Sequence, residues 1–168
     1  MKVLIDTSYF LPFIKIKIKN IPQNLLITLF KNYKHKYYYS DLTIFELIAK
    51  GLKLSSKDNA KITPEDIRIG IDSIQNDERL KNLSYMDCPF IIELTSTLRK
   101  IHKDTIDCLI FATAFCVCDC LITMDVSFFN QITQNSDLIE KINEINENFK
   151  FWFNDLSEGL KSISLNNK

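Results

Sequence analysis

The pattern of hydrophobic and polar positions in residues 104–129 predicts a buried helix, a strand and a second short helix. Apolar residues recur at helical spacing over residues 106–115, which is typical of a helix inside a core. The apolar run at residues 120–123 then predicts a strand. Asp107 lies at the start of the helix, and Asp125 lies just after the strand. Strand carboxyl ends and helix amino ends share one edge of an open parallel sheet, so we expect these acids to lie close together.

The rest of the chain repeats this alternation of strand and helix patterns. Thr63 before Pro64 is a clear helix start. Gly51 is expected to help end the preceding helix, ahead of a polar loop at residues 52–63. The order of elements predicts an α/β fold with a mainly parallel sheet. The other predicted strands are residues 3–5, 34–39, 80–86 and 149–153, and the other predicted helices are residues 22–30, 44–52, a segment from Pro64, 89–103 and 137–148.

Length and composition fit one domain. A chain of 168 residues with 46% apolar content can fill a sizeable core, and no internal repeat is visible. We expect a single domain at residues 1–156, followed by a polar carboxyl-terminal tail at residues 157–168. The first residues are too short an apolar run for a signal peptide, and no run is long enough to span a membrane. We therefore expect a cytoplasmic protein without a membrane partner.

Positive charge is unevenly distributed along a chain that is neutral overall. Lys and Arg number 21, as do Asp and Glu, so net charge does not point to a nucleic-acid partner. Lysines nevertheless gather in residues 15–36, a stretch without acids, and three tyrosines follow at residues 37–39. This segment could follow a phosphate backbone and stack on bases, or it could be a solvated helix face beside core aromatics.

Neither the cysteines nor the histidines form a recognisable site in the sequence. Five cysteines in a chain without an export signal are expected to be reduced thiols. Cys116, Cys118 and Cys120 lack the paired spacing of zinc ligands, so packing as small hydrophobic residues is the favoured interpretation. His35 and His102 are expected to be surface or packing residues.

Four acids occupy comparable places in the predicted elements, either just after a strand or near the start of a helix. Each has an alternative role as a helix cap, and Asp104 with Asp107 approximates a capping box, as does Thr43 with the acid three residues later. Four caps converging on one edge of one sheet would be unusual. The four acids are Asp6, Glu46, Asp107 and Asp125.

Clustered carboxylates would require a cation. They repel one another, and each has its pKa raised unless positive charge lies among them. Mg²⁺ takes oxygen ligands from one or two carboxylates and keeps several waters, and paired ions can clamp a phosphodiester for in-line attack. A metal-activated water would then be the nucleophile, and the sequence shows no convincing Ser/His/Asp or Cys/His group for that role.

Four motifs in sequence resemble PIN-domain nucleases, and the resemblance extends to the prokaryotic set that includes VapC-type toxins. The motifs lie at residues 4–8, 40–47, 107–114 and 121–129, and their order and spacing span nearly the whole chain. The resemblance implies a three-layer α/β/α sandwich around a mainly parallel sheet, and often a homodimer. It also implies that the acidic positions hold Mg²⁺ or Mn²⁺ for hydrolysis of RNA phosphodiester bonds, and it raises the possibility of an antitoxin partner. Those positions fall on Asp6, Glu46, Asp107 and Asp125.

Neighbouring residues extend this predicted site. Asp104 lies one turn before Asp107, so it could be an extra ligand, although a helix cap is the favoured role. Thr7 and Thr123 adjoin acidic positions, where a hydroxyl could orient a carboxylate or a metal-bound water. Met124 stands where relatives often carry a basic residue. The chain is also longer than a compact toxin of this class, so the nuclease role is better supported than the toxin role.

The sequence therefore predicts a single-domain, metal-dependent ribonuclease, with RNA as substrate. The alternative is a PIN-like RNA-binding or protein-binding regulatory module with little or no hydrolysis. A third hypothesis is a structural α/β domain whose acids are only caps. That hypothesis predicts that Asp107→Asn removes a cap, at a cost of about 1 kcal/mol.

Overall fold

The computed structural model describes residues 1–18, 25–31, 34–57, 60–155 and 159–164. Its centre is a six-stranded sheet with the order β3-β2-β1-β4-β5-β6. The first five strands by number are all parallel, and only β6 runs antiparallel, beside β5. The strands are β1 (Lys2–Ile5), β2 (Lys36–Ser40), β3 (Leu80–Leu83), β4 (Cys120–Thr123), β5 (Lys150–Asp155) and β6 (Gly159–Ser164).

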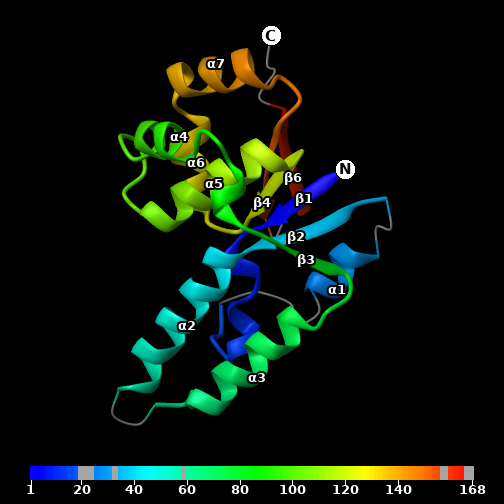
Figure 1. Ribbon diagram of the computed structural model, residues 1–168, viewed down its shortest axis with the longest axis vertical. Helices are drawn as coiled ribbons and strands as arrows, with labels where there is room; N and C mark the ends of the chain where they lie inside the picture. The colour runs from blue at the N-terminus through cyan, green and yellow to red at the C-terminus, as the bar shows by residue number, and fades with distance from the viewer. Residues whose placement is uncertain (19–24, 32–33, 58–59, 156–158, 165–168) are drawn as a thin grey trace.

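Helices cover both faces of the sheet and give three layers (Figure 1). Side chains alternate along each strand, so Leu4 of β1 packs in one core and its neighbours Val3 and Ile5 pack in the other. The first core lies under α4 (Ile91–Leu98), α5 (Thr105–Val117), α6 (Val126–Thr133) and α7 (Ser136–Ile145). The second lies under α1 (Leu25–Phe30), α2 (Asp41–Ser55), α3 (Pro64–Gln75) and the 3₁₀ turns η1 (Thr7–Tyr9) and η2 (Leu11–Ile14).

This architecture confirms the predicted α/β class and the three-layer, PIN-like arrangement around a mainly parallel sheet. The predicted strands were found close to their expected bounds because each is a short apolar or aromatic run between turns. The helix from Pro64 begins as expected, with Thr63 and Asp66 in a reciprocal capping box. The expected start of a helix at Pro22 lies outside the described residues.

Some helix boundaries differ from prediction. Helix α2 runs through to Ser55, so it includes Gly51, which was expected near its end. A Cβ atom at Gly51 would meet the side chain of Ile67 at 2.8 Å, so the glycine permits α2 and α3 to pack closely. Helix α4 is also shorter than predicted, and a short 3₁₀ turn, η3 (Tyr85–Asp87), precedes it.

Residues 157–168 were expected to be a polar carboxyl-terminal tail, polar enough to fray. Instead Gly159–Ser164 forms β6 and pairs with β5, from Lys150↔Ser164 to Asp155↔Gly159. A polar edge strand has no hydrophobic run to reveal it, and only its backbone pairing defines it. The expected division into a domain and a tail stays a prediction.

The cysteines depart in part from the prediction of five reduced thiols. Cys88 and Cys116 form a disulfide, with a Cα–Cα distance of 5.4 Å and a sequence separation of 28 residues. The fold brings them together by packing η3 and α4 against α5, which spacing alone does not reveal. Cys108, Cys118 and Cys120 are free and buried, so packing as small hydrophobic residues is confirmed for the last two.

None of the helices in the described part of the chain combines the length and the apolar character that a membrane span requires.

Candidate active site

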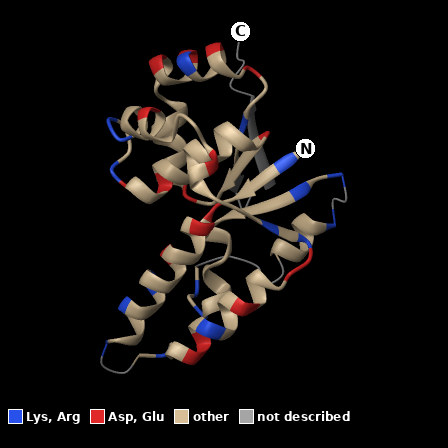
Figure 2. Cartoon of the chain, viewed as in Figure 1, with Lys and Arg blue, Asp and Glu red and all other residues tan. Residues whose placement is uncertain are grey.

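The central strands bring the predicted acids to one edge of the sheet. Asp6 directly follows β1, and Asp125 lies two residues after β4, which pairs with β1 in parallel. On the other side of β1, strand β2 leads at once into α2, which carries Glu46. Helix α5 begins at Thr105, so Asp107 lies in its first turn. Acidic residues gather near the middle of the molecule, where the upper end of α2 meets the ends of the central strands (Figure 2).

Asp6 is buried and held in one orientation. Its Oδ2 atom accepts hydrogen bonds from the Ser8 hydroxyl at 2.6 Å, the Thr123 hydroxyl at 2.9 Å and the Ser8 backbone N–H at 3.3 Å. These bonds leave Oδ1 as the oxygen available for another partner. Burial raises the pKa of Asp6, hydrogen bonding by Ser8 opposes that change, and the charge of Glu46 adds to it.

Thr123 therefore orients the Asp6 carboxylate, which is one of the two roles predicted for its hydroxyl. It also accepts a hydrogen bond from the Asp125 backbone N–H at 3.0 Å, which links the turns after β1 and β4. Thr7 has a different partner, because its hydroxyl lies 3.5 Å from the Thr43 hydroxyl. The N-cap of α2 is Ser40, so Thr43 and Glu46 do not form the capping box that their spacing suggested.

Glu46 is buried near Asp6, and only one of its two carboxylate oxygens has a partner among the described residues. Its Oε1 atom lies 2.5 Å from the Nζ atom of Lys50, one helical turn further along α2. Its Oε2 atom is buried and has no hydrogen-bond partner among the described residues. Such an atom normally carries a substantial desolvation penalty, so an unpaired carboxylate oxygen indicates a missing partner.

Asp107 is mostly buried and bonds a histidine. Its Oδ2 atom lies 2.7 Å from Nε2 of His102, and its side chain is 17% exposed. Burial raises the pKa of Asp107 to about 7, with further contributions from the charges of Asp6 and Glu46, against the lowering effect of the His102 hydrogen bond. Asp107 is not a cap. Asp104 takes that role, since its Oδ1 atom accepts from the backbone N–H of Ile106 at 2.8 Å.

Asp125 is the most open of the four acids. It caps α6 through Oδ1, which accepts from the Phe128 backbone N–H at 2.9 Å. Its charge also acts on the buried His102, so it lies near the Asp107 side of the cluster. The capping roles that the sequence suggested for Asp6 and Asp125 are therefore confirmed. Both residues still lie at the edge of the sheet where the acids gather.

Two residues of this site were missed by sequence analysis. His102 was expected to be a surface or packing residue, but it is buried and contacts Asp107. In the sequence, only its position five residues before Asp107 could have indicated this contact. Lys50 follows Glu46 by four residues, a spacing that permits an ion pair on one helix face. Burial lowers the pKa of Lys50, but bonding to Glu46 and the charges of Glu46, Asp107 and Asp6 outweigh it, so the net change is upward.

Of the two interpretations of the tyrosines at residues 37–39, the structure favours core packing over base stacking for two of them. Tyr37 and Tyr39 are buried in the core beneath α1 and α3, as the alternative of core aromatics required. Lys15 of the lysine-rich stretch pairs with Asp66 at 2.6 Å. Residues 19–24 and 32–33 of that stretch lie outside the described residues.

The donor set fits a hard divalent cation. Among the described residues, no group of three or more His, Cys, Asp and Glu side chains is already arranged to hold a metal ion. However, the edge offers carboxylate oxygens from three elements, including the unpaired Oε2 of Glu46 and the uncommitted Oδ1 of Asp6. Oxygen ligands of this kind suit Mg²⁺ and Mn²⁺ better than softer metals.

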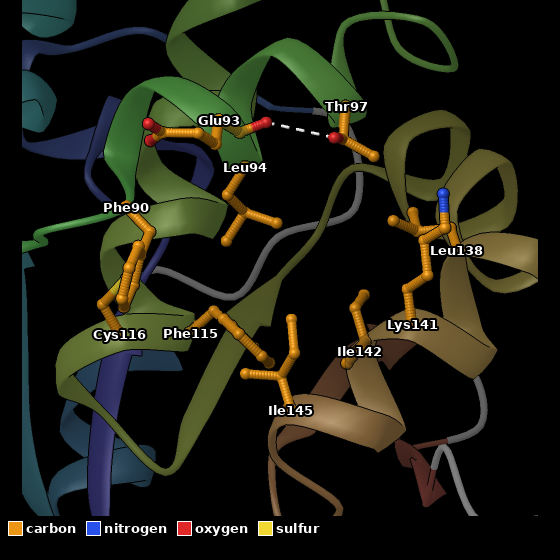
Figure 3. Close-up of a pocket in the computed structure, with 10 residues that line it drawn as sticks. All are labelled: Phe90, Glu93, Leu94, Thr97, Phe115, Cys116, Leu138, Lys141, Ile142 and Ile145. Atoms are coloured by element: carbon orange, nitrogen blue, oxygen red, sulfur yellow. Dashed lines mark hydrogen bonds between the residues drawn. The ribbon is translucent and has the colours of Figure 1, made fainter.

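A concavity away from the four acids has an apolar character. It is an apolar groove of about 360 Å³ between α4, α5 and α7, and none of the acids lines it. Figure 3 shows Leu94, Phe115 and Ile142 facing one another across it, with Glu93 and Lys141 at its margins.

Comparison with known proteins bears on the fold. No protein-family model and no curated protein sequence matches this chain. Among solved structures, the chain is similar to one in the crystal structure of VapBC2 from Rickettsia felis bound to a DNA fragment from their promoter. The identity is 22% and the TM-score is 0.54, over 77% of this chain and 92% of that one. At this identity the similarity supports the fold alone.

Proposed function

We propose that this chain is a metal-dependent ribonuclease of the PIN type, which hydrolyses RNA phosphodiester bonds at the edge formed by β1, β4, α2 and α5. The observation that carries the proposal is the burial of Asp6, Glu46 and Asp107 within electrostatic reach of one another. Isolated buried carboxylates are unfavourable unless a cation or a proton neutralises them. Carboxylates with raised pKa values, such as Asp6 and Asp107, are typical of functional sites when they gather at the carboxyl ends of parallel strands.

The side chains divide the work between them. Asp6 and Asp107 would be the principal ligands of Mg²⁺ or Mn²⁺, because each has one oxygen fixed by hydrogen bonds and the other available. Glu46 would be a further ligand, or would orient the attacking water through Oε2. Asp125, the most exposed of the four acids, would be a further metal ligand. A bound divalent cation supplies charge stabilisation at the phosphoryl oxygen and an ionised water at neutral pH.

Lys50 has a place in this mechanism as a positive charge at the edge of the cluster. Its side chain is about half exposed, so it can leave Glu46 and turn toward solvent. With Glu46 acting as a metal ligand, the Lys50 ammonium group would be available for a phosphate oxygen of the substrate. Neutralising phosphate charge in this way favours both RNA binding and hydrolysis.

We also propose a protein partner of the antitoxin type and a homodimer. The support is the similarity to a chain of VapBC2, which was crystallised as a complex on promoter DNA. A toxin-antitoxin role goes further than the nuclease proposal and depends on it. Its test is co-purification of the chain with the product of a neighbouring gene, and suppression of RNA cleavage by that product.

The nuclease proposal is tested by melting temperature against Mn²⁺ and Mg²⁺, for wild type and Asp107→Asn in parallel. We expect a metal-dependent rise in wild type that the variant loses, because a ligand that binds only the folded state stabilises it by about 2.7 kcal/mol at a hundred times its dissociation constant. Without metal, Asp107→Asn should be neutral or stabilising, because it removes one of the crowded charges. RNA cleavage should require the same metals and should be abolished by the substitution.

The alternative of a binding module is supported by one observation, the Lys50 ammonium already placed against Glu46. It predicts RNA binding that neither depends on divalent metal nor leads to cleavage. No shift in melting temperature at millimolar metal, together with retained RNA binding, would favour the module and contradict the nuclease proposal.

A further inference from the structure

His102 links α5, which carries Asp107, to α6, the helix that Asp125 caps. It lies in the turn between α4 and α5, and its imidazole contacts Asp107 through Nε2 and Gln131 through Nδ1, at 2.7 and 2.8 Å. Gln131 is on α6, the helix that Asp125 caps. The hydrogen bonds therefore run from the first turn of α5 to the body of α6.

The imidazole is held from several directions. Its ring lies against Phe128, with centroids 4.6 Å apart, and the residue is only 8% exposed. Its backbone N–H donates to the Leu98 carbonyl at 2.9 Å, and its carbonyl accepts from the Arg99 guanidinium at 3.3 Å. A ring fixed in this way restricts the carboxylate that it bonds.

The local chemistry leaves one oxygen of Asp107 free. Asp104 takes the capping role at the start of α5, so the Asp107 carboxylate is not drawn to the backbone. The amide oxygen of Gln131 accepts at Nδ1, so Nε2 also donates to Oδ2 of Asp107 when the imidazole is protonated, and Oδ1 accepts no hydrogen bond from the described residues. Gln131 is steadied in turn, because its Nε2 donates to the Ser127 hydroxyl at 3.1 Å.

We propose that His102 is a positioning residue, which presents Oδ1 of Asp107 to a divalent cation and fixes Asp107 relative to Asp125 through Gln131. The inference rests on the proposed function, since it concerns the same metal site. Some residues hydrogen-bond a metal-ligating carboxylate or histidine without contacting the metal themselves. Removing such a residue typically lowers metal affinity or activity about 10–100-fold. The role requires a hydrogen-bond donor at His102 rather than a ring.

The test compares two substitutions that separate these properties. His102→Phe keeps an aromatic ring against Phe128 but removes the donor, whereas His102→Gln keeps an N–H donor in a non-aromatic side chain. We expect His102→Phe to weaken Mn²⁺ binding by about 10–100-fold in isothermal titration at fixed pH. His102→Gln should bind Mn²⁺ more tightly than His102→Phe. RNA cleavage at saturating Mn²⁺ should follow the same order.

A matched control is available in the other histidine. His35 contacts the rings of Tyr37 and Trp152 and is not bonded to any of the acids in the described structure. His35→Phe should therefore bind Mn²⁺ as wild type does, even if its melting temperature changes. Melting temperatures without metal, measured for all three variants, show whether a loss of binding follows from unfolding.

The outcomes separate this inference from the proposed function. If wild type and His102→Phe bind Mn²⁺ equally, the positioning role is overturned while the nuclease proposal stands. If His102→Gln binds no better than His102→Phe, the hydrogen bond is not what acts, and the inference is also overturned. If wild type binds neither Mn²⁺ nor Mg²⁺, both proposals fail together.

Discussion

Single residues at this edge combine roles that a sequence presents as alternatives. Asp6 accepts the bonds of a cap through Oδ2 and still has Oδ1 available, so capping and cation binding do not exclude each other. Of Asp104 and Asp107, which lie three residues apart, the fold commits only the first to the backbone, so the second remains available for the proposed cation. The structural hypothesis of acids that are merely caps therefore fails for Asp107, and also for Glu46, which caps nothing.

Lys50 gives a prediction at this scale. Lys50→Met removes the cation that partly neutralises Glu46, Asp6 and Asp107. We expect a modest loss of stability without metal, about 1 kcal/mol or less because the ammonium is half exposed. The rise in melting temperature produced by Mn²⁺ should be larger than in wild type, because no internal cation competes. Lys53→Met, on the same helix and exposed, is the control. An unchanged Mn²⁺ response would contradict this role.

At the scale of elements, α2 and α3 hold the acidic edge in place from one side. Helix α3 packs against η2 and α2, and two glycines allow these close approaches. A Cβ at Gly70 would collide with the backbone carbonyl of Phe13, whereas a Cβ at Gly51 would meet side-chain atoms alone, Cδ1 and Cγ1 of Ile67 at 2.8 Å and Cδ1 of Ile14 at 3.4 Å. A side-chain tip can rotate away, but a backbone carbonyl cannot.

The changes in the free energy of unfolding caused by Gly70→Ala and Gly51→Ala should therefore differ in size. Gly70→Ala should destabilise the protein by about 1–3 kcal/mol, which is typical of overpacking. Gly51→Ala should destabilise less than Gly70→Ala, because the gain in helix propensity of about 1 kcal/mol partly offsets the shift that the Ile67 side chain must make. Urea denaturation measures both. Equal destabilisation by the two substitutions would show that the contact with Phe13 is not the limiting one.

At the scale of the whole molecule, the buried acids make stability depend on pH. The pKa of Asp107 rises from 3.8 to about 7 on folding, so the folded state binds more protons than the unfolded state between these values. The raised pKa values of Asp6 and His102 act in the same direction. Without metal, stability should therefore fall as pH rises from about 4 to about 7.

Metal should oppose that trend. In the proposed function a divalent cation would bind the ionised carboxylates, so at saturating Mn²⁺ the loss of stability toward pH 7 should become smaller or disappear. Thermal unfolding at pH 5 and pH 8, with and without Mn²⁺, measures the difference. Asp107→Asn removes one of these raised pKa values and should weaken the pH dependence in the absence of metal. A metal-free protein that is more stable at pH 8 than at pH 5 would contradict the assignment.

The sequence by itself determined the order of strands and helices and the chain positions of the four acids. Periodicity and turn residues are local signals, so β1, β4 and α5 could be predicted from them. Because parallel strands end at a common edge, the convergence of Asp6 and Asp107 followed from the same signals.

Only the tertiary structure decided which groups meet there. His102 and Gln131 come together from the start of α5 and from α6, and Cys88 meets Cys116 across 28 residues. Strand β6 is defined by its pairing with β5. The requirement for a glycine at position 51 comes from the close approach of Ile67. These contacts join residues far apart along the chain, and local periodicity carries no information about such partners. Packing and hydrogen bonding select them only once the layers have assembled.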